Sequence, residues 1–261
     1  MTMSEEIEHL VRGHLEAVGR GDDDSVVHSR NRNRGGLMRA AFLSGEAVVV
    51  KFWRSRNMKE RLKRFFRVSN GRREWCVHSA VYAAGVPTPK PVGFCGSVTS
   101  SAGHFEAMAI ADLGETTRVL THIKTLIHDG DEDAVSQCEQ GLIDITLGLI
   151  NMGVLDIDHQ LNNFLVDSRG GLFRVDFECA RLAGGLRTGR KRLVEMLARL
   201  LLSHAFAVQP DTDRTVAFAM RLYGALAIDG STKAQIFESV KTKLEFQRMD
   251  SGINTEVALP L

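Results

Sequence analysis

The stretch LDIDHQLNNFLVDSRGGLFRVDFECAR, residues 155–181, carries the residues that decide the fold class. Two runs typical of short β-strands, FLVD and LFRVDF, flank the turn sequence SRGG, which indicates a loop that leads into a hairpin. Asp158 lies in the loop, Asn163 ends it, and Asp176 closes the second strand. Because a hairpin folds its second strand back along the first, we expect Asp176 to lie beside Asn163. Three oxygen-bearing side chains are therefore expected to converge.

These three side chains suit the chemistry of phosphoryl transfer. A carboxylate and an amide oxygen are ligands that Mg²⁺ accepts, and the ion completes its shell with water and phosphate oxygens. A second carboxylate can orient a hydroxyl nucleophile and accept its proton. The alternative is that Asp158 and Asn163 only shape turns and that Asp176 only caps a chain end. The joint spacing of the three residues argues against this alternative.

The residues before this stretch predict a sheet with one helix. AFL, the turn SGE and AVVVKFW predict a hairpin whose second strand carries Lys51. A helix is predicted over residues 72–84 from its apolar spacing, and Gly85 is placed to end it in a left-handed conformation. HFEAMAIA, residues 104–111, predicts a further strand.

The second half of the chain is predicted to be mainly helical. Residues 141–152 are apolar nearly all round, as in a buried helix, a helical stripe runs from Leu193 to His204, and further helices are expected beyond Asp211. This order indicates an α+β protein of two lobes that share a cleft. The expected organisation is an N-terminal helical extension over 1–25, a first lobe over 26–110 and a second lobe over 111–261.

Composition and charge restrict the class of protein. The 261 residues are 44% hydrophobic and 25% charged, which is typical of a soluble globular protein. No window approaches the ~18 uninterrupted apolar residues that span a membrane. The N-terminus has no apolar signal segment, so a cytoplasmic location is expected. The four cysteines lack metal-ligand spacing and are expected to be reduced and mostly buried.

A basic segment, defined here as Arg54–Arg73, stands out against the net charge of +1. Its nine Lys and Arg residues are opposed only by Glu60, and Phe65 and Phe66 lie in the middle. Basic residues interleaved with aromatic ones suit an anionic membrane surface, a phosphorylated glycolipid or nucleic acid. A solvated helix face and loop is the structural alternative.

Taken in this order, the motifs resemble those of the protein-kinase-like superfamily, D-x-x-x-x-N followed by D-F-x after a short hairpin. The resemblance implies that Asp158 is the catalytic aspartate and that Asn163 and Asp176 bind Mg²⁺. It also implies that Lys51 contacts the α- and β-phosphates of ATP. Glu74, on the following helix, is the ion-pair partner that the resemblance gives to this lysine.

Within the superfamily, the chain is similar to bacterial lipopolysaccharide core kinases, the group of Kdo and heptose kinases. The pattern comprises the strand lysine, the Arg-rich stretch, R-E-W, GVPTPKP, NFLVD, VDFECARL and LARLLLS, and it runs from Arg34 to Ser203. The resemblance implies phosphoryl transfer from ATP to a sugar hydroxyl at the cytoplasmic face of the inner membrane. The expected partners are ATP and an anionic sugar or glycolipid acceptor, with the basic segment at the acceptor or membrane surface. No nucleic acid is expected.

Several departures from the superfamily pattern bear on activity. Asp156 replaces the His usually found two residues before the catalytic aspartate, so the support which that His gives the metal-binding loop is missing or rebuilt. His159 is a candidate substitute, and a loop histidine that faces solvent is its alternative. Glu178 replaces the D-F-G glycine. The phosphate-covering loop is reduced to Gly35 and Gly36, to which phosphate contact is assigned.

Three alternatives to the glycolipid kinase remain open. A kinase for a soluble aminoglycoside or choline-like compound has a cationic acceptor, which the basic segment would repel. An atypical, short protein kinase is the second, although no A-P-E motif or long activation segment follows Arg181. The third is a pseudokinase that binds nucleotide or a partner without catalysis. The missing His favours it, whereas the complete set of Lys51, Glu74, Asp158, Asn163 and Asp176 argues against it.

Overall fold

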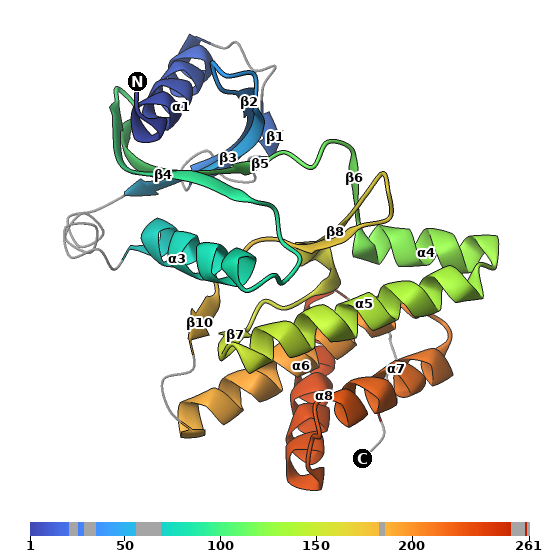
Figure 1. Ribbon diagram of the computed structural model, residues 1–261. Helices are drawn as coiled ribbons and strands as arrows, with labels where there is room; N and C mark the ends of the chain where they lie inside the picture. The colour runs from blue at the N-terminus through green and yellow to red at the C-terminus, as the bar shows by residue number, and fades with distance from the viewer. Residues whose placement is uncertain (21–25, 29–34, 56–68, 183–185, 252–258, 260–261) are drawn as a thin grey trace. The chain divides into compact units, whose positions relative to one another are not determined.

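The computed structural model describes residues 1–20, 26–28, 35–55, 69–182, 186–251 and 259. The chain divides into two compact units, Met1–Leu113 and Gly114–Leu261 (Figure 1). Over the described ranges, no helix combines the length and the apolar character needed to cross a membrane.

The first unit is built on a five-stranded antiparallel sheet with the order β1-β2-β3-β5-β4. Successive side chains of β3 alternate between faces, because residues of a strand point to opposite sides of its sheet. Val48, Val50 and Phe52 therefore enter the core, while Lys51 points to the other face. The predicted hairpin with Lys51 in its second strand is confirmed. The strands are β1 Val26–His28, β2 Gly35–Ala41, β3 Ala47–Ser55, β4 Pro91–Ser100 and β5 Gly103–Ala111.

Two described helices belong to the first unit. Helix α1, Met3–Arg20, packs on β4 and buries Ile7 and Val11 completely in the core of the sheet (Figure 1). Gly93 of β4 permits this approach, because a Cβ there would lie 2.6 Å from Met3 Cγ. The predicted N-terminal helix is thus amphipathic and is part of the hydrophobic core.

Helix α3, Asn70–Ala83, begins and ends with ordinary capping interactions. The Ser69 hydroxyl oxygen accepts a hydrogen bond from the Arg72 N–H at 3.3 Å, which satisfies a donor of the first turn. Gly85 follows the helix with φ of 78°, and the Val86 N–H donates to the Val81 carbonyl. This left-handed ending is the one that the sequence predicts.

The second unit is mainly helical and holds short strands. The buried helix predicted over 141–152 is the second half of α5, which ends at Asn151 with Met152 as its C-cap, and the helices predicted beyond Asp211 are α7 and α8. The helices are α4 Val119–Asp129, α5 Glu132–Asn151, α6 Leu186–Val208, α7 Thr212–Ala225 and α8 Gly230–Ser251. The strands and the 3₁₀ turn are β6 Thr116–Arg118, β7 Val154–Asp156, η1 Leu161–Asn163, β8 Phe164–Asp167, β9 Leu172–Arg174 and β10 Ala180–Leu182.

The predicted hairpin of the second unit is the pair β8–β9, with Phe164 opposite Arg174 and Val166 opposite Leu172. Strand β6 adds to its other edge, and β7 pairs with β10. Leu149 of α5 and Leu197 and Leu200 of α6 are fully buried. The loop between β7 and β8 contacts α6, where the Leu161 backbone N–H donates to Ser203 Oγ at 3.1 Å.

All four cysteines are free, as predicted, but their predicted burial is wrong for three of them. Only Cys95 is buried, Cys76 is exposed, and Cys138 and Cys179 are half-buried. Cys76 lies on α3, where its neighbours Glu74 and Val77 take the buried positions. Burial raises the pKa of the Cys138 thiol to about 12, so this thiol stays protonated.

Candidate functional site

The loop between β7 and β8 carries Asp158 and Asn163, and hydrogen bonds fix their relative orientation. The Asn163 side-chain nitrogen donates to the Asp158 carbonyl at 2.8 Å and to its Oδ2 at 3.0 Å. The other carboxylate oxygen, Oδ1, accepts from the Gln160 Nε2 at 3.0 Å. The Asp158 side chain is 34% exposed, so a solvent-borne group can reach it. A carboxylate that is both oriented and accessible is suited to bind a hydroxyl group.

Arg199 of α6 adds a positive charge beside this carboxylate. Its Nε lies 3.8 Å from Asp158 Oδ1, and its side chain is 37% exposed. A half-exposed pair of this kind is screened by water and contributes little to stability. The guanidinium therefore has donors available to a further anionic group. In the sequence Arg199 lies within LARLLLS, 41 positions beyond Asp158, and no local pattern pairs the two residues.

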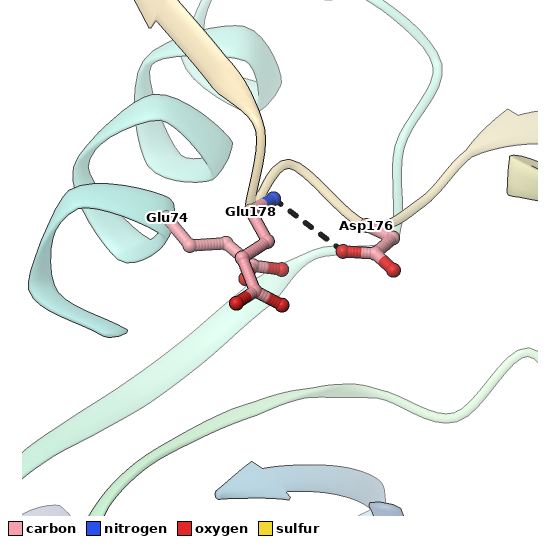
Figure 2. A group of neighbouring side chains, drawn as sticks. All are labelled: Glu74, Asp176 and Glu178. Carbon is pink, nitrogen blue, oxygen red and sulfur yellow. Dashed lines mark hydrogen bonds between the residues drawn. The ribbon is translucent and has the colours of Figure 1, made fainter. Parts of the chain in front are cut away.

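Asp176 lies next to Asn163 through the strand that precedes it. The backbone N–H of Val175 donates to the Asn163 carbonyl at 2.9 Å. Asp176 then adopts a left-handed conformation with φ of 63°, which Asp tolerates better than most residues. The Glu178 N–H donates to Asp176 Oδ1 at 3.4 Å, as Figure 2 shows. The predicted adjacency of Asp176 and Asn163 along the hairpin is thus present, and the strained φ is typical of functional positions.

The donor set of this region fits a hard divalent cation. Because the Asn163 amide nitrogen makes both contacts with Asp158, its amide oxygen lies on the other branch of the side chain. Asp176 supplies a carboxylate one residue after Val175, whose N–H bonds to the Asn163 carbonyl. An amide oxygen and a carboxylate are ligands that Mg²⁺ takes together with waters and phosphate oxygens. Metal binding by Asn163 and Asp176 stays a prediction.

Asp156, which stands where the superfamily has a His, forms a buried ion pair with Arg174 of β9. Arg174 Nη2 lies 2.5 Å from Asp156 Oδ2, and neither side chain is exposed to solvent. Burial raises the pKa of the Asp156 carboxyl, and the charge of Arg174 counteracts this rise. The sequence points to Asp156 but not to its partner. The signal was a single arginine within the otherwise apolar run LFRV.

His159 is fully buried, so the alternative of a loop histidine that faces solvent is wrong. Its Nε2 lies 2.9 Å from Thr146 Oγ1 of α5, and its ring packs edge-on against Phe164 at 5.1 Å between centroids. Thr146 donates its own proton to the Leu142 carbonyl, so the His159 Nε2–H is the donor to Thr146. Burial, and then the nearby charge of Arg174, lower the pKa of His159 well below its usual range, which keeps the imidazole neutral.

In the first unit, Lys51 and Glu74 form the ion pair that the resemblance implies. Lys51 Nζ lies 2.9 Å from each carboxylate oxygen of Glu74, which is labelled on α3 in Figure 2. The Glu74 side chain is 2% exposed and that of Lys51 16%. Lys51 Nζ also lies 5.2 Å from the Trp53 ring centroid. The pair therefore holds the ammonium group in one place between β3 and α3, and its contact with phosphate stays a prediction.

Gly35 and Gly36 lie in strand β2, opposite Trp53 and Phe52, and not in a loop as their sequence suggested. A Cβ on Gly35 would lie 2.0 Å from the Phe52 carbonyl oxygen, and one on Gly36 2.8 Å from the Phe52 ring. Close packing against β3 thus accounts for both glycines. Their contact with phosphate stays a prediction.

Most of the basic segment, residues 56–68, lies outside the described residues. At its described end, Arg73 donates to Asn70 Oδ1 at 2.9 Å, and the Arg72 guanidinium lies 5.4 Å from the Phe94 ring centroid. These contacts belong to α3 and β4. The role of the segment toward anions or a membrane stays a prediction.

The two units have the elements of the protein-kinase-like fold: an antiparallel sheet with α3 first, then a helical unit that carries the loop and hairpin of Asp158, Asn163 and Asp176. A solved structure of WaaP in complex with acyl carrier protein is similar to this chain, with a TM-score of 0.60 and 16% identity over 92% of this chain and 98% of that one. ROP2 from Toxoplasma gondii, a virulence factor with a protein-kinase fold and no enzymatic activity, has a TM-score of 0.45 and 15% identity. The match covers 84% of this chain and 80% of that one. No protein-family model matches the sequence, and the comparison with curated proteins finds no match.

Proposed function

We propose that this chain is an ATP-dependent kinase that phosphorylates a hydroxyl group of a lipopolysaccharide-core sugar, Kdo or heptose. The observation that carries the proposal is the Asp158 carboxylate, held by Asn163 and Gln160 yet 34% exposed, in a protein-kinase-like fold similar to that of WaaP. An oriented carboxylate that solvent can reach is what a kinase needs to receive an acceptor hydroxyl.

In the proposed reaction Asp158 accepts a hydrogen bond from the acceptor hydroxyl and takes its proton as the oxygen attacks the γ-phosphorus of ATP. The new bond joins the acceptor oxygen to this phosphorus, the bond to the bridging oxygen breaks, and ADP leaves. Both oxygens of Asp158 already accept hydrogen bonds, so the carboxylate has a fixed direction before the acceptor arrives. Such positioning supplies much of the rate in phosphoryl transfer.

The remaining residues of the set bind the nucleotide. Lys51, fixed by Glu74, contacts the α- and β-phosphates of ATP. Asn163 and Asp176 hold Mg²⁺, which when bound neutralises phosphate charge.

The acceptor proposed for this site is anionic. Arg199 places a guanidinium group 3.8 Å from Asp158, and guanidinium groups match carboxylate and phosphate geometry. A cationic aminoglycoside or choline-like acceptor would be repelled at the same position. The basic segment adds nine cationic residues to the chain, which supports an anionic glycolipid at the cytoplasmic face of the inner membrane as the acceptor.

A product screen tests this function. The purified chain is incubated with ATP and Mg²⁺ and, in parallel, with lipopolysaccharide cores that end in Kdo or heptose, an aminoglycoside, choline and a generic protein substrate. We expect phosphate on a core sugar and on no other acceptor. Phosphorylated aminoglycoside, choline or protein would replace the proposal by the corresponding alternative. Binding of ATP without any product would favour the pseudokinase.

A further inference from the structure

The Asp156–Arg174 pair contacts both ends of the loop that carries the proposed catalytic residues. Asp156 Oδ1 accepts the backbone N–H of Asp158 at 2.9 Å, while its Oδ2 faces Arg174. Arg174 Nη1 donates to the backbone carbonyl of Asn163 at 3.0 Å. A continuous path of three hydrogen bonds therefore runs from Asp158 through the ion pair to Asn163.

Stability alone does not account for a pair of this kind. Removal of two charges from water costs about as much as their attraction returns, so apolar residues of similar volume serve equally well in many cores. The surroundings here are apolar, with the Phe164 and Phe177 ring centroids 5.4 and 5.1 Å from the Arg174 guanidinium. Two apolar side chains would fill this space. They would not make directed hydrogen bonds to the backbone of Asp158 and Asn163.

We propose that Asp156 and Arg174 are positioning residues for phosphoryl transfer, which fix Asp158 and Asn163 relative to each other. In this role they replace the His that supports the same loop in the superfamily. The proposal rests on the proposed function. The planar fork of Arg174 suits this role, because two of its nitrogens bind two acceptors at a fixed angle. The carbonyl of Asn163 also accepts the Val175 N–H, so the last residue of β9 and the residue after it both contact this end of the loop.

The consequence of losing the pair is a change in the chemical step. The Asn163 side chain orients the Asp158 carboxylate through a 3.0 Å hydrogen bond, so a small shift at either end of the loop misdirects that carboxylate. Supporting contacts of this type are worth about 10- to 100-fold in activity. We expect kcat to fall by this factor, while KM for ATP changes less than about threefold, since the pair does not bind nucleotide.

Two double variants separate directed hydrogen bonding from charge. Asp156→Leu with Arg174→Met removes both charges and all three hydrogen bonds but leaves no buried charge unpaired. Asp156→Asn with Arg174→Gln is equally neutral and keeps an acceptor for the Asp158 N–H, whereas the shorter Gln side chain does not reach the Asn163 carbonyl. Glu139→Gln serves as a control, because this buried carboxylate contacts His204 and Arg221 and not the loop.

The experiment measures kcat and KM on the acceptor found in the screen, together with hydrogen exchange of the peptide 157–163 and of 143–150 in α5. For the Leu/Met variant we expect the fall in kcat and faster exchange in 157–163 alone. We expect the Asn/Gln variant, which keeps the contact to the Asp158 N–H, to regain part of both losses, and Glu139→Gln to keep the wild-type kcat. If the Leu/Met variant folds with wild-type kcat and wild-type exchange in 157–163, or the Asn/Gln variant regains nothing, the positioning role is wrong. A wild type that phosphorylates nothing refutes the proposed function, and the exchange comparison then still decides whether the pair holds the loop.

Discussion

Replacement of Lys51 by Met has an effect on stability that the structure makes calculable. Both oxygens of Glu74 lie 2.9 Å from Lys51 Nζ, and the Glu74 side chain is 2% exposed. Lys51→Met therefore leaves a buried carboxylate without the cation that both oxygens face. Breaking a buried pair in this way costs about 3–5 kcal/mol. We expect the lower end, about 3 kcal/mol in the free energy of unfolding, because the 16% exposure of Lys51 lets water approach.

The reverse change is expected to cost less. In Glu74→Gln the lysine keeps a flexible stem and can turn its ammonium group toward solvent, so we expect a loss of about 1 kcal/mol. The double variant Lys51→Met with Glu74→Leu leaves no unpaired charge at this site and is expected to lie within about 1 kcal/mol of the wild type. All three variants are expected to lose ATP turnover, since none presents a fixed ammonium group.

Tryptophan fluorescence during urea unfolding measures these differences in the first unit alone. The chain has two tryptophans, Trp53 on β3 and Trp75 on α3, and both belong to this unit. The midpoint and slope give the free energy of unfolding for each variant. A Lys51→Met protein as stable as the wild type, or one more stable than Glu74→Gln, would refute the reasoning about the buried carboxylate.

Three further changes probe other parts of the structure. The pKa of His159 is lowered far below 6.5, so between that lowered value and 6.5 the unfolded chain binds a proton that the folded chain does not. The free energy of unfolding therefore falls as the pH falls below 6.5, by up to about 1.4 kcal/mol per pH unit from this site. We expect His159→Asn to remove this pH dependence, measured by urea unfolding followed by circular dichroism. Arg199→Ala is expected to lower kcat/KM for the anionic acceptor by about 10- to 100-fold in steady-state assays, with KM for ATP unchanged and Arg199→Lys intermediate. Ile7→Ala is expected to cost about 2–5 kcal/mol in the tryptophan-monitored unfolding of the first unit, against less than about 0.5 kcal/mol for His9→Ala on the exposed face of the same helix.

For each of these three changes, a specific result would contradict the expectation. A difference between wild type and His159→Asn that is constant from pH 7 to pH 5 would show that the histidine is not held neutral. Arg199→Ala with unchanged kcat/KM for the anionic acceptor would remove Arg199 from acceptor binding. Equal effects of Ile7→Ala and His9→Ala would mean that α1 does not belong to the core of the first unit.

Local patterns were sufficient to predict much of the fold. The hairpin with Lys51 followed from alternation and a turn sequence, and the end of α3 followed from Gly85, whose φ of 78° is the conformation the sequence required. The β8–β9 hairpin followed from SRGG between two apolar runs. These features depend on residues that are neighbours in the sequence, where turn chemistry and periodicity act directly.

The features that were missed depend on contacts between distant segments. Arg174 meets Asp156 across 18 positions, because β9 brings it back beside the end of β7. His159 lies in a polar loop and looks solvent-facing until α5 supplies Thr146 as its partner. Gly35 and Gly36 resemble loop glycines, and only the packing against Phe52 explains them as strand residues. Periodicity and turn signals carry no information about such pairings.

The measurement that tests the central claim most directly is the acceptor-dependent turnover of ATP by the wild type and by Asp158→Asn. Asp144→Asn is the matched control, because Asp144 is an exposed aspartate of α5 in the same unit, and its side chain accepts a hydrogen bond from Gln140 of the same helix. We expect the control to keep wild-type kcat and Asp158→Asn to lose about 100-fold or more, while both bind ATP as the wild type does. Turnover by Asp158→Asn at the wild-type rate would contradict the account.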